Sequence, residues 1–202
     1  MDAGAPRTET EERRAHLLAT ALRLFGEHGV AAVGMRQVAR AAGVSLGGLQ
    51  HHFRTKRDLE QAVLGDVMNG YRREQGPALE AETFAELLAA GFRGQVAWAR
   101  ANPNVVALGA RLALEDPHHE WPGEHEMNEE LIQRIRDAQT DRVLRSFDPR
   151  LFIAMLEALL NAWTAHRDHY ARHLQHLDAS TLDDAFCDFA VNALLDGIRP
   201  RD

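Results

Sequence analysis

The sequence predicts an all-α protein with about nine helices. Apolar residues recur at spacings of three and four along most of the 202 residues, and no segment shows the strict alternation of a half-buried strand. Glycine, proline and capping residues mark the ends of these apolar segments. Hydrophobic residues make up 45% of the chain, which is enough for a buried core.

Four helices are expected in the first 80 residues. Gly29 ends the first apolar segment, and Gly43 closes a short second one. Ser45 is placed to cap a third helix, and Thr55 with Asp58 resembles a capping box at the start of a longer fourth helix. Gly76 and Pro77 then break the pattern. The expected ranges are 11–28, 35–42, 45–53 and 55–74.

Five more helices are expected in the remainder. Thr83 with Glu86 repeats the capping-box signature, and Asp148 followed by proline is a strong helix start. Residues 116–123, with the sequence DPHHEWPG, form the clearest loop. The expected ranges are 83–100, 103–115, 124–146, 148–176 and 181–197.

Charge is distributed unevenly along the chain, whose net charge is −7. Residues 1–60 hold nine basic and seven acidic side chains, a net charge of +2, which leaves −9 for the rest. A slightly basic end on an acidic body allows binding to DNA through that end alone. No apolar run approaches the roughly 18 residues needed to span a bilayer, so we expect no membrane partner and a cytoplasmic protein.

The segment 35–59 carries the most informative pattern. Two short helices flank Gly43, because a residue without a Cβ permits the left-handed turn between them. Apolar residues supply the contacts that fix the crossing of the two helices: Val38, Ala42, Val44, Leu49 and Phe53. This is the organisation of a helix-turn-helix, whose second helix enters the major groove of DNA.

Residues 13–64 closely resemble the DNA-binding domain of the TetR family of regulators. The resemblance covers about a quarter of the chain. The matching elements are Ala21-Leu22-Arg23-Leu24-Phe25, Gly29, Met35-Arg36-Gln37-Val38-Ala39, Ala42-Gly43-Val44-Ser45, Leu49, His51-His52-Phe53 and Lys56 through Leu59.

The resemblance implies a recognition helix over 45–52 and a set of DNA contacts. Arg36 is a phosphate contact by position, and Lys56 lies where the following helix points its N-terminus at a phosphate. The implied DNA-binding residues are Arg36, Ser45, Leu46, Gly47, Gly48, Gln50, His51 and Lys56. The chain departs from the family at Leu46, where a basic residue is usual, and at Gln50, where a tyrosine is usual. A leucine at position 46 is suited to a thymine methyl group.

The resemblance further implies a division into a DNA-binding domain over 1–60 and an effector-binding and dimerisation domain over 61–202. The last two long helices, 150–176 and 181–196, would pair between two subunits, and an effector pocket would lie within 83–170. The expected pocket residues are Phe92, Trp98, Trp121, Met127, Met155 and Trp163. Trp121 lies in the polar loop, and we expect it to cover the pocket entrance.

The function expected from these features is ligand-responsive repression by a homodimer on a palindromic operator, with release by an unidentified small-molecule effector. An enzyme is not expected, because the sequence has no phosphate-binding glycine loop and no HExxH motif. An architectural DNA-binding protein without an effector is a further alternative, although the large second domain argues against it.

Histidine usage leaves a metal-responsive regulator as an alternative, although no cofactor is expected. His166, His169, His173 and His176 share one helical face, and His118, His119 and His125 cluster in or beside the loop. A solvated histidine stripe is the commoner outcome. Cys187, the only cysteine, excludes an intramolecular disulfide and is expected to be a buried apolar residue rather than a redox-sensing thiol.

Overall fold

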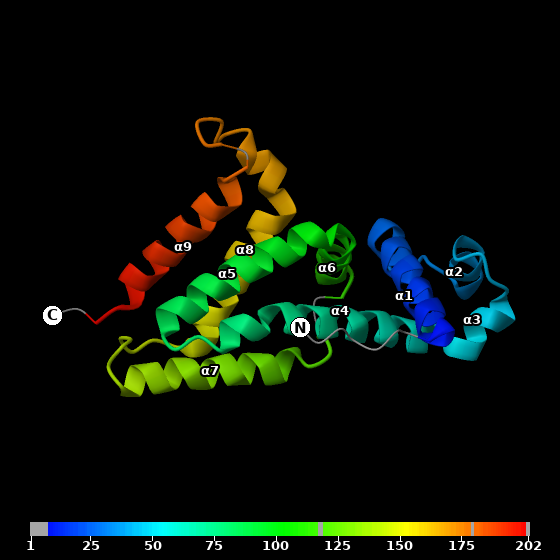
Figure 1. The fold of residues 1–202 in the computed structure, drawn as a ribbon, viewed down its shortest axis with the longest axis horizontal. Coiled ribbons are helices and arrows are strands. Elements are labelled where there is room, and N and C mark those ends of the chain that lie inside the picture. Colours follow the sequence, from blue (N-terminus) through cyan, green and yellow to red (C-terminus); the bar gives the residue numbers. More distant parts are fainter. Residues whose placement is uncertain (1–7, 117–118, 179, 201–202) are drawn as a thin grey trace. The chain divides into compact units, whose positions relative to one another are not determined.

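The computed structural model describes residues 8–116, 119–178 and 180–200 (Figure 1). Within these residues the chain forms nine α-helices and no strand, which confirms the predicted fold class. The helices are α1 Glu9–His28, α2 Met35–Ala41, α3 Leu46–His52, α4 Lys56–Leu79, α5 Phe84–Ala101, α6 Pro103–Glu115, α7 Glu124–Thr140, α8 Pro149–Ala171 and α9 Leu182–Ile198.

Three helix ends differ from the sequence prediction. α4 continues through Gly76 and Pro77 and ends at Leu79. The proline ring fixes φ near the helical value, so the last turn of the helix can contain it although one backbone donor is lost. α7 ends at Thr140 rather than near residue 146. Two residues after this end, Arg142 adopts a left-handed φ of 58° and turns the chain. α8 ends at Ala171, and hydrogen-bonded turns follow it instead of helix up to residue 176.

The chain forms two compact units. The head unit contains the described residues up to Asn69 together with Pro103–Pro122, and the body unit contains Gly70–Asn102 and the described residues from Gly123 onward. α6 therefore packs in the head unit, although it follows α5 in the chain. The predicted functional division between residues 60 and 61 stays a prediction.

The attachment of α6 to α1 explains why the head unit includes it. A Cβ on Gly26 would lie 2.9 Å from the carbonyl oxygen of Asn104, so glycine allows the two backbones to approach closely. Arg111 of α6 donates to the carbonyl oxygens of Gly26 and Glu27, at 2.7 and 2.6 Å. These carbonyls lie in the last turn of α1, where no N–H group of the helix donates to them. The Arg111 guanidinium supplies the missing donors.

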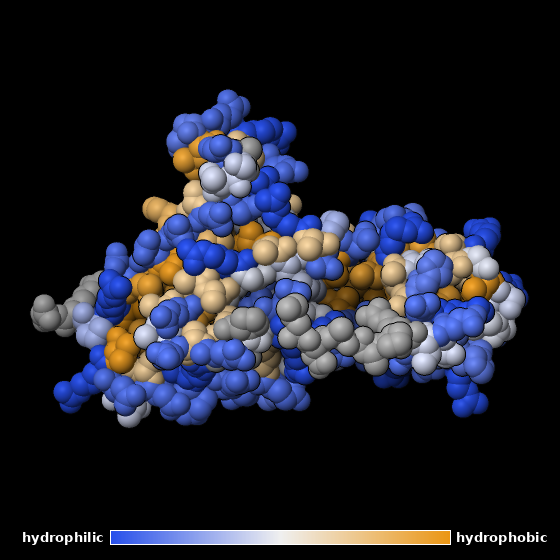
Figure 2. All heavy atoms as spheres, in the orientation of Figure 1, coloured by the Kyte–Doolittle hydropathy of each residue, from blue (hydrophilic) through white to orange (hydrophobic). Residues whose placement is uncertain are grey.

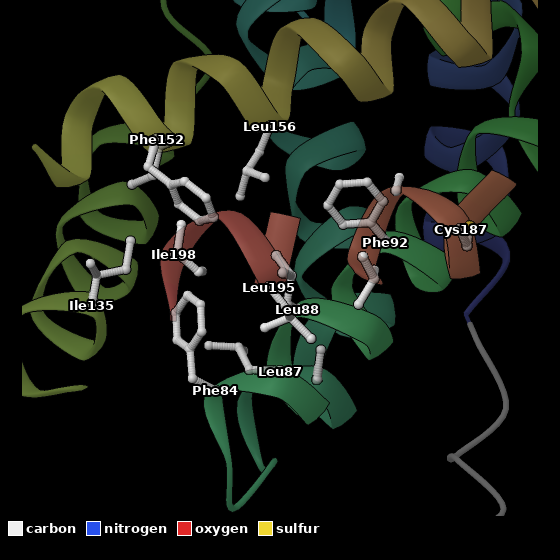
Figure 3. Packing of buried hydrophobic residues seen from close by; sticks show 14 of the residues in the cluster. Phe84, Leu87, Leu88, Phe92, Ile135, Phe152, Leu156, Cys187, Leu195 and Ile198 are labelled. Carbon is white, nitrogen blue, oxygen red and sulfur yellow. The ribbon is translucent and has the colours of Figure 1, made fainter. Parts of the chain in front are cut away.

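The body unit is built around one hydrophobic cluster that draws on α4, α5, α7, α8 and α9. Figure 3 shows Phe152 and Leu156 of α8 pointing toward side chains of α5 and α9, including Phe92 and Leu195. The outer side of α7 is mainly hydrophilic (Figure 2), which is the pattern of an amphipathic surface helix. Across the described part of the chain, no helix is both long enough and apolar enough to cross a membrane.

Candidate functional site

The turn between α2 and α3 has the geometry that the sequence predicts. Gly43 adopts a φ of +69°, which L side chains rarely adopt, and the backbone N–H of Val44 donates to Ala39 O at 3.0 Å. The ring nitrogen Nε2 of His16 lies 3.2 Å from Ala42 O, so α1 contributes a polar contact that holds the turn. α2 and α3 are therefore fixed both to each other and to α1.

α3 has one buried and one exposed face. Ser45 caps it, and its hydroxyl oxygen accepts from the backbone N–H of Gly48 at 3.0 Å. Leu49 is buried on the inner face, and Phe53, the residue that follows the helix, is buried as well. Gly47, Gln50 and His51 are exposed. A helix with this division presents a polar outer face that is accessible to a groove of DNA.

Most of the residues implied as DNA contacts are accessible. Arg36, Ser45, Gly47, Gly48, Gln50 and His51 are exposed, whereas Leu46 and Lys56 are half-buried. The Lys56 ammonium donates to Ala31 O at 3.0 Å, which ties the start of α4 to the loop after α1. An ammonium has three protons, so this hydrogen bond leaves donors for a phosphate. The DNA contacts themselves stay predictions.

Two basic residues of α1 belong to the same charged surface, and the sequence reasoning missed them. Arg14 places its guanidinium 5.4 Å from the centre of the Phe53 ring. The pKa of His52 is lowered by burial first, and then by repulsion from His51, Arg13 and Arg14. α1 therefore contributes basic side chains near the end of α3. Spacing within α1 gives no signal for this, because it depends on how α1 crosses α3.

A cavity of about 160 Å³ lies within the body unit, between α4, α5, α7 and α8. Its apolar walls come from one stripe of each helix, at spacings of three and four residues. The lining residues are Tyr71, Gln75, Ala78, Phe84, Leu87, Leu88, Gly91, Phe92, Gln95, Met127, Asn128, Leu131, Ile153, Leu156, Glu157 and Leu160. A concave, mostly apolar cavity with a few polar groups is the usual form of a small-molecule site.

The structure places only two of the predicted pocket residues, Phe92 and Met127, on this cavity wall. Trp98 does not line the cavity, and its ring centre lies 5.2 Å from that of the lining residue Tyr71. Met155 faces outward and is 45% exposed. Trp163 is a core residue whose ring stacks on Phe186 at 3.9 Å, and its polar group is satisfied.

Trp121 belongs to the head unit rather than to the body unit that contains the cavity. It packs against the hydrophobic cluster of the head unit, close to Gly109 and edge-on to the ring of His119. Local packing therefore accounts for a tryptophan in this polar loop, and the expected role as a cover over the pocket stays a prediction.

The polar lining residues were missed because each lies on an otherwise apolar helix face. Burial, with a smaller contribution from the Glu157 carboxylate, raises the pKa of Tyr71 to about 12. Burial also raises the pKa of Glu157, with repulsion from Glu124 added, while a hydrogen bond from Asn128 opposes the shift. Gln75 and Gln95 complete the polar set. The only signal in the sequence for these polar lining residues was glutamine at positions where the helical pattern predicts a core residue.

The histidine clusters do not form a metal site in the described residues, where no group of three or more ligating side chains is placed to hold an ion. The rings of His169 and His173 lie 5.1 Å apart, and His119 contacts Trp121. His118 lies outside the described residues. The metal-responsive alternative is therefore not supported.

The single thiol is buried as well. Burial raises the pKa of Cys187 to about 11, which keeps it protonated and unreactive near neutral pH. This agrees with the expectation of an apolar core residue.

Residues 17–63 match the family model described as "Bacterial regulatory proteins, tetR family". Two curated relatives match part of the chain. The HTH-type transcriptional regulator AcrR of Shigella flexneri is 45% identical over 51 residues, 25% of this chain and 24% of that protein. The HTH-type transcriptional repressor KstR2 of Rhodococcus jostii is 35% identical over 80 residues, 38% of this chain and 39% of that protein. The matches thus span less than half the length of these relatives.

Solved structures extend the likeness of fold to nearly the whole chain. AibR in complex with isovaleryl coenzyme A and operator DNA has a TM-score of 0.69 at 16% identity, covering 90% of this chain and 97% of that one. A putative transcriptional regulator from Saccharomonospora viridis in complex with choline has a TM-score of 0.68 at 18% identity, covering 95% and 100%. Residues 17–63 therefore match the TetR family of bacterial regulators, and nearly the whole chain shares the fold of these solved structures.

Proposed function

We propose that this protein is a ligand-responsive transcriptional repressor that acts as a homodimer on a palindromic operator and is released from it by a small-molecule effector. The observation that carries the proposal is the presence, in one chain, of a helix-turn-helix with an exposed polar face and of a mostly apolar cavity in a separate compact unit. The family assignment also favours a regulator over an enzyme, as the sequence predicts.

The head unit supplies the features that binding to DNA requires. Gln50 and His51 lie on the exposed face of α3, within reach of base edges or the backbone when the helix enters a major groove. Arg36 is exposed at the start of α2, and Arg13 and Arg14 add positive charge near the end of α3. Basic residues at this position attract phosphates and give binding a strong dependence on salt.

Apolar side chains exposed on α8 and α9 support the homodimer. Leu151 and Phe189 are 72% and 78% exposed, and Met155 on α8 is also accessible. Large apolar side chains at such exposure favour a partner that covers them. A second copy of this chain is the partner that a self-complementary two-fold interface provides, and two-fold symmetry requires a palindromic operator.

The cavity supports an effector, because its walls are formed by four helices of the body unit and include five polar side chains. The complexes of AibR with isovaleryl coenzyme A and of the Saccharomonospora viridis regulator with choline are formed by proteins of this fold. Their ligands differ greatly in size and charge, so the effector of this chain has to be inferred from its own cavity.

One helix contributes residues both to the unit that contains the helix-turn-helix and to the cavity wall. α4 starts at Lys56 in the head unit and carries Tyr71, Gln75 and Ala78 of the cavity wall in the body unit. Arg72 of α4 also donates to Gly123 O, at the start of α7, at 2.6 Å. A ligand that shifts this part of α4 changes the position of its N-terminal half. Such a switch needs only a few kcal/mol of differential affinity between two states.

Selection of bound fragments from the genome of the source bacterium, followed by footprinting, tests the proposal. We expect an inverted repeat whose half-sites are centred about 34–36 Å apart, or a multiple of that spacing. Gln50→Ala is expected to weaken binding to this site at least tenfold. The matched change Gln133→Ala, at an exposed glutamine of α7, is expected to leave it unchanged. Fragments without a shared inverted repeat would contradict the proposal.

An architectural DNA-binding protein without an effector is the second candidate. It predicts the same DNA footprint but no release by any compound that binds the body unit. Competition between operator and cavity ligands in the same binding assay therefore separates the two functions.

A further inference from the structure

The charge of the cavity lining limits the ligands that it accepts. Among its described lining residues, Glu157 is the one acidic side chain and none is basic; Glu157 is itself partly open to solvent. Glu124 adds negative charge nearby, because it repels the Glu157 carboxylate and so raises its pKa together with burial. An anionic ligand would meet repulsion here without any opposite charge in the wall. A cationic ligand would gain a counter-ion.

Two polar atoms in the wall are buried and have no hydrogen-bond partner. They are Nε2 of Gln75, a donor, and Oε1 of Gln95, an acceptor. Gln75 is only 8% exposed, and its amide is packed against α5, where a Cβ on Gly94 would lie 3.2 Å from Nε2. Buried polar atoms are nearly always paired in native proteins, so unpaired ones on a cavity wall mark positions for ligand atoms.

The size of the cavity sets a second limit. A volume of about 160 Å³ is close to that of an engineered apolar cavity of roughly 150 Å³ that binds benzene. Aromatic rings of Tyr71, Phe84 and Phe92 form part of the wall, and such rings attract cations as well as apolar groups. A ligand that fits without expansion of the body unit therefore has an apolar part about the size of one aromatic ring.

We infer that the effector site takes a small organic amine in its protonated form, with the ammonium group between Glu157 and Gln95 and an apolar body against the aromatic wall. The inference rests on the proposed function, because it names the ligand class of the same cavity. Glu157 acts as the counter-ion, and Oε1 of Gln95 accepts one ammonium proton. The Gln75 amide is then available to donate to an oxygen atom elsewhere on the natural ligand.

Calorimetry with three probes of similar shape tests this assignment on the full chain, without DNA and near neutral pH. The probes are benzylamine, benzyl alcohol and benzoate, which are cationic, neutral and anionic. We expect benzylamine to bind at least tenfold more tightly than benzyl alcohol, and benzoate to bind most weakly. Equal affinity for the three probes, tighter binding of benzoate, or no binding of benzylamine at millimolar concentration would overturn the inference.

Two glutamate variants locate the charge that recognises the amine. Glu157→Gln is expected to remove the preference for benzylamine over benzyl alcohol while retaining the alcohol, which shows that the cavity is still folded. Glu130→Gln changes an exposed glutamate of α7 outside the lining and is expected to behave as wild type. A benzylamine preference that survives Glu157→Gln would contradict the inference. DNA binding is measured in a separate assay, so the ligand preference can be interpreted even if the proposed repressor function fails.

Discussion

Asp183, at the start of α9, connects three helices of the body unit. Its carboxylate accepts from Nε of Arg167 at 2.9 Å and from Nε1 of Trp163 at 3.0 Å, both on α8, and it forms an ion pair with Arg100 of α5. Burial alone would raise the pKa of Asp183, but the hydrogen bonds from Arg167, Trp163 and Arg100 outweigh it and lower the pKa. The charged form is therefore favoured by folding.

Asp183→Asn is expected to destabilise the protein by about 2 kcal/mol near neutral pH, because it leaves charged donors with a weaker acceptor. A lowered folded-state pKa means that the stabilisation is complete above the ordinary value of 3.8 and is lost as pH falls through the folded value. Urea unfolding of both proteins at several pH values measures this. The control Asp188→Asn changes an exposed ion pair with Arg93 and is expected to cost little. A difference for Asp183 that stays constant at acidic pH would refute the explanation.

At the scale of elements, the two short helices of the head unit depend on the turn between them. Gly43→Ala is expected to destabilise the protein by about 1–2 kcal/mol, because its φ of +69° strains any side chain even though the space is open. Gly65→Ala, inside α4 and also in open space, is expected to stabilise it by about 0.5–1 kcal/mol. Thermal unfolding of the two variants gives opposite shifts if the conformation of the turn is the cause. Equal shifts would argue against it.

The elements also show what the sequence determines locally. Gly43, Ser45 and the Asp148-Pro149 start carry their own backbone signals, so the helix-turn-helix and the start of α8 were predictable. The packing of α6 in the head unit rests on Gly26 and Arg111, which meet residues about 80 positions away. The surroundings of Trp163 in the core and of Phe92 at the cavity also depend on contacts between distant helices. Helical periodicity therefore could not distinguish the two residues.

At the scale of the whole molecule, the proposed repressor consists of two subunits. Phe189→Glu is expected to raise the dimer dissociation constant at least tenfold, since it places a charge among the exposed apolar residues of α8 and α9. Leu114→Glu is the matched control, because Leu114 is also highly exposed but lies on α6 of the head unit. Sedimentation velocity over a range of concentrations measures both. Dissociation caused equally by the two changes, or by neither, would contradict the proposed interface.

Fluorescence anisotropy with a duplex from the promoter of the protein's own gene, titrated at several salt concentrations, tests whether the head unit binds DNA. We expect salt-sensitive binding that is much tighter than to random duplex, and Arg36→Ala is expected to weaken it and reduce the salt slope by about two per dimer. Arg136→Ala removes an equally exposed arginine from α7 and is expected to leave both quantities unchanged. Binding no tighter than to random duplex, or identical effects of the two arginine changes, would contradict the assignment of the head unit as the DNA-binding surface.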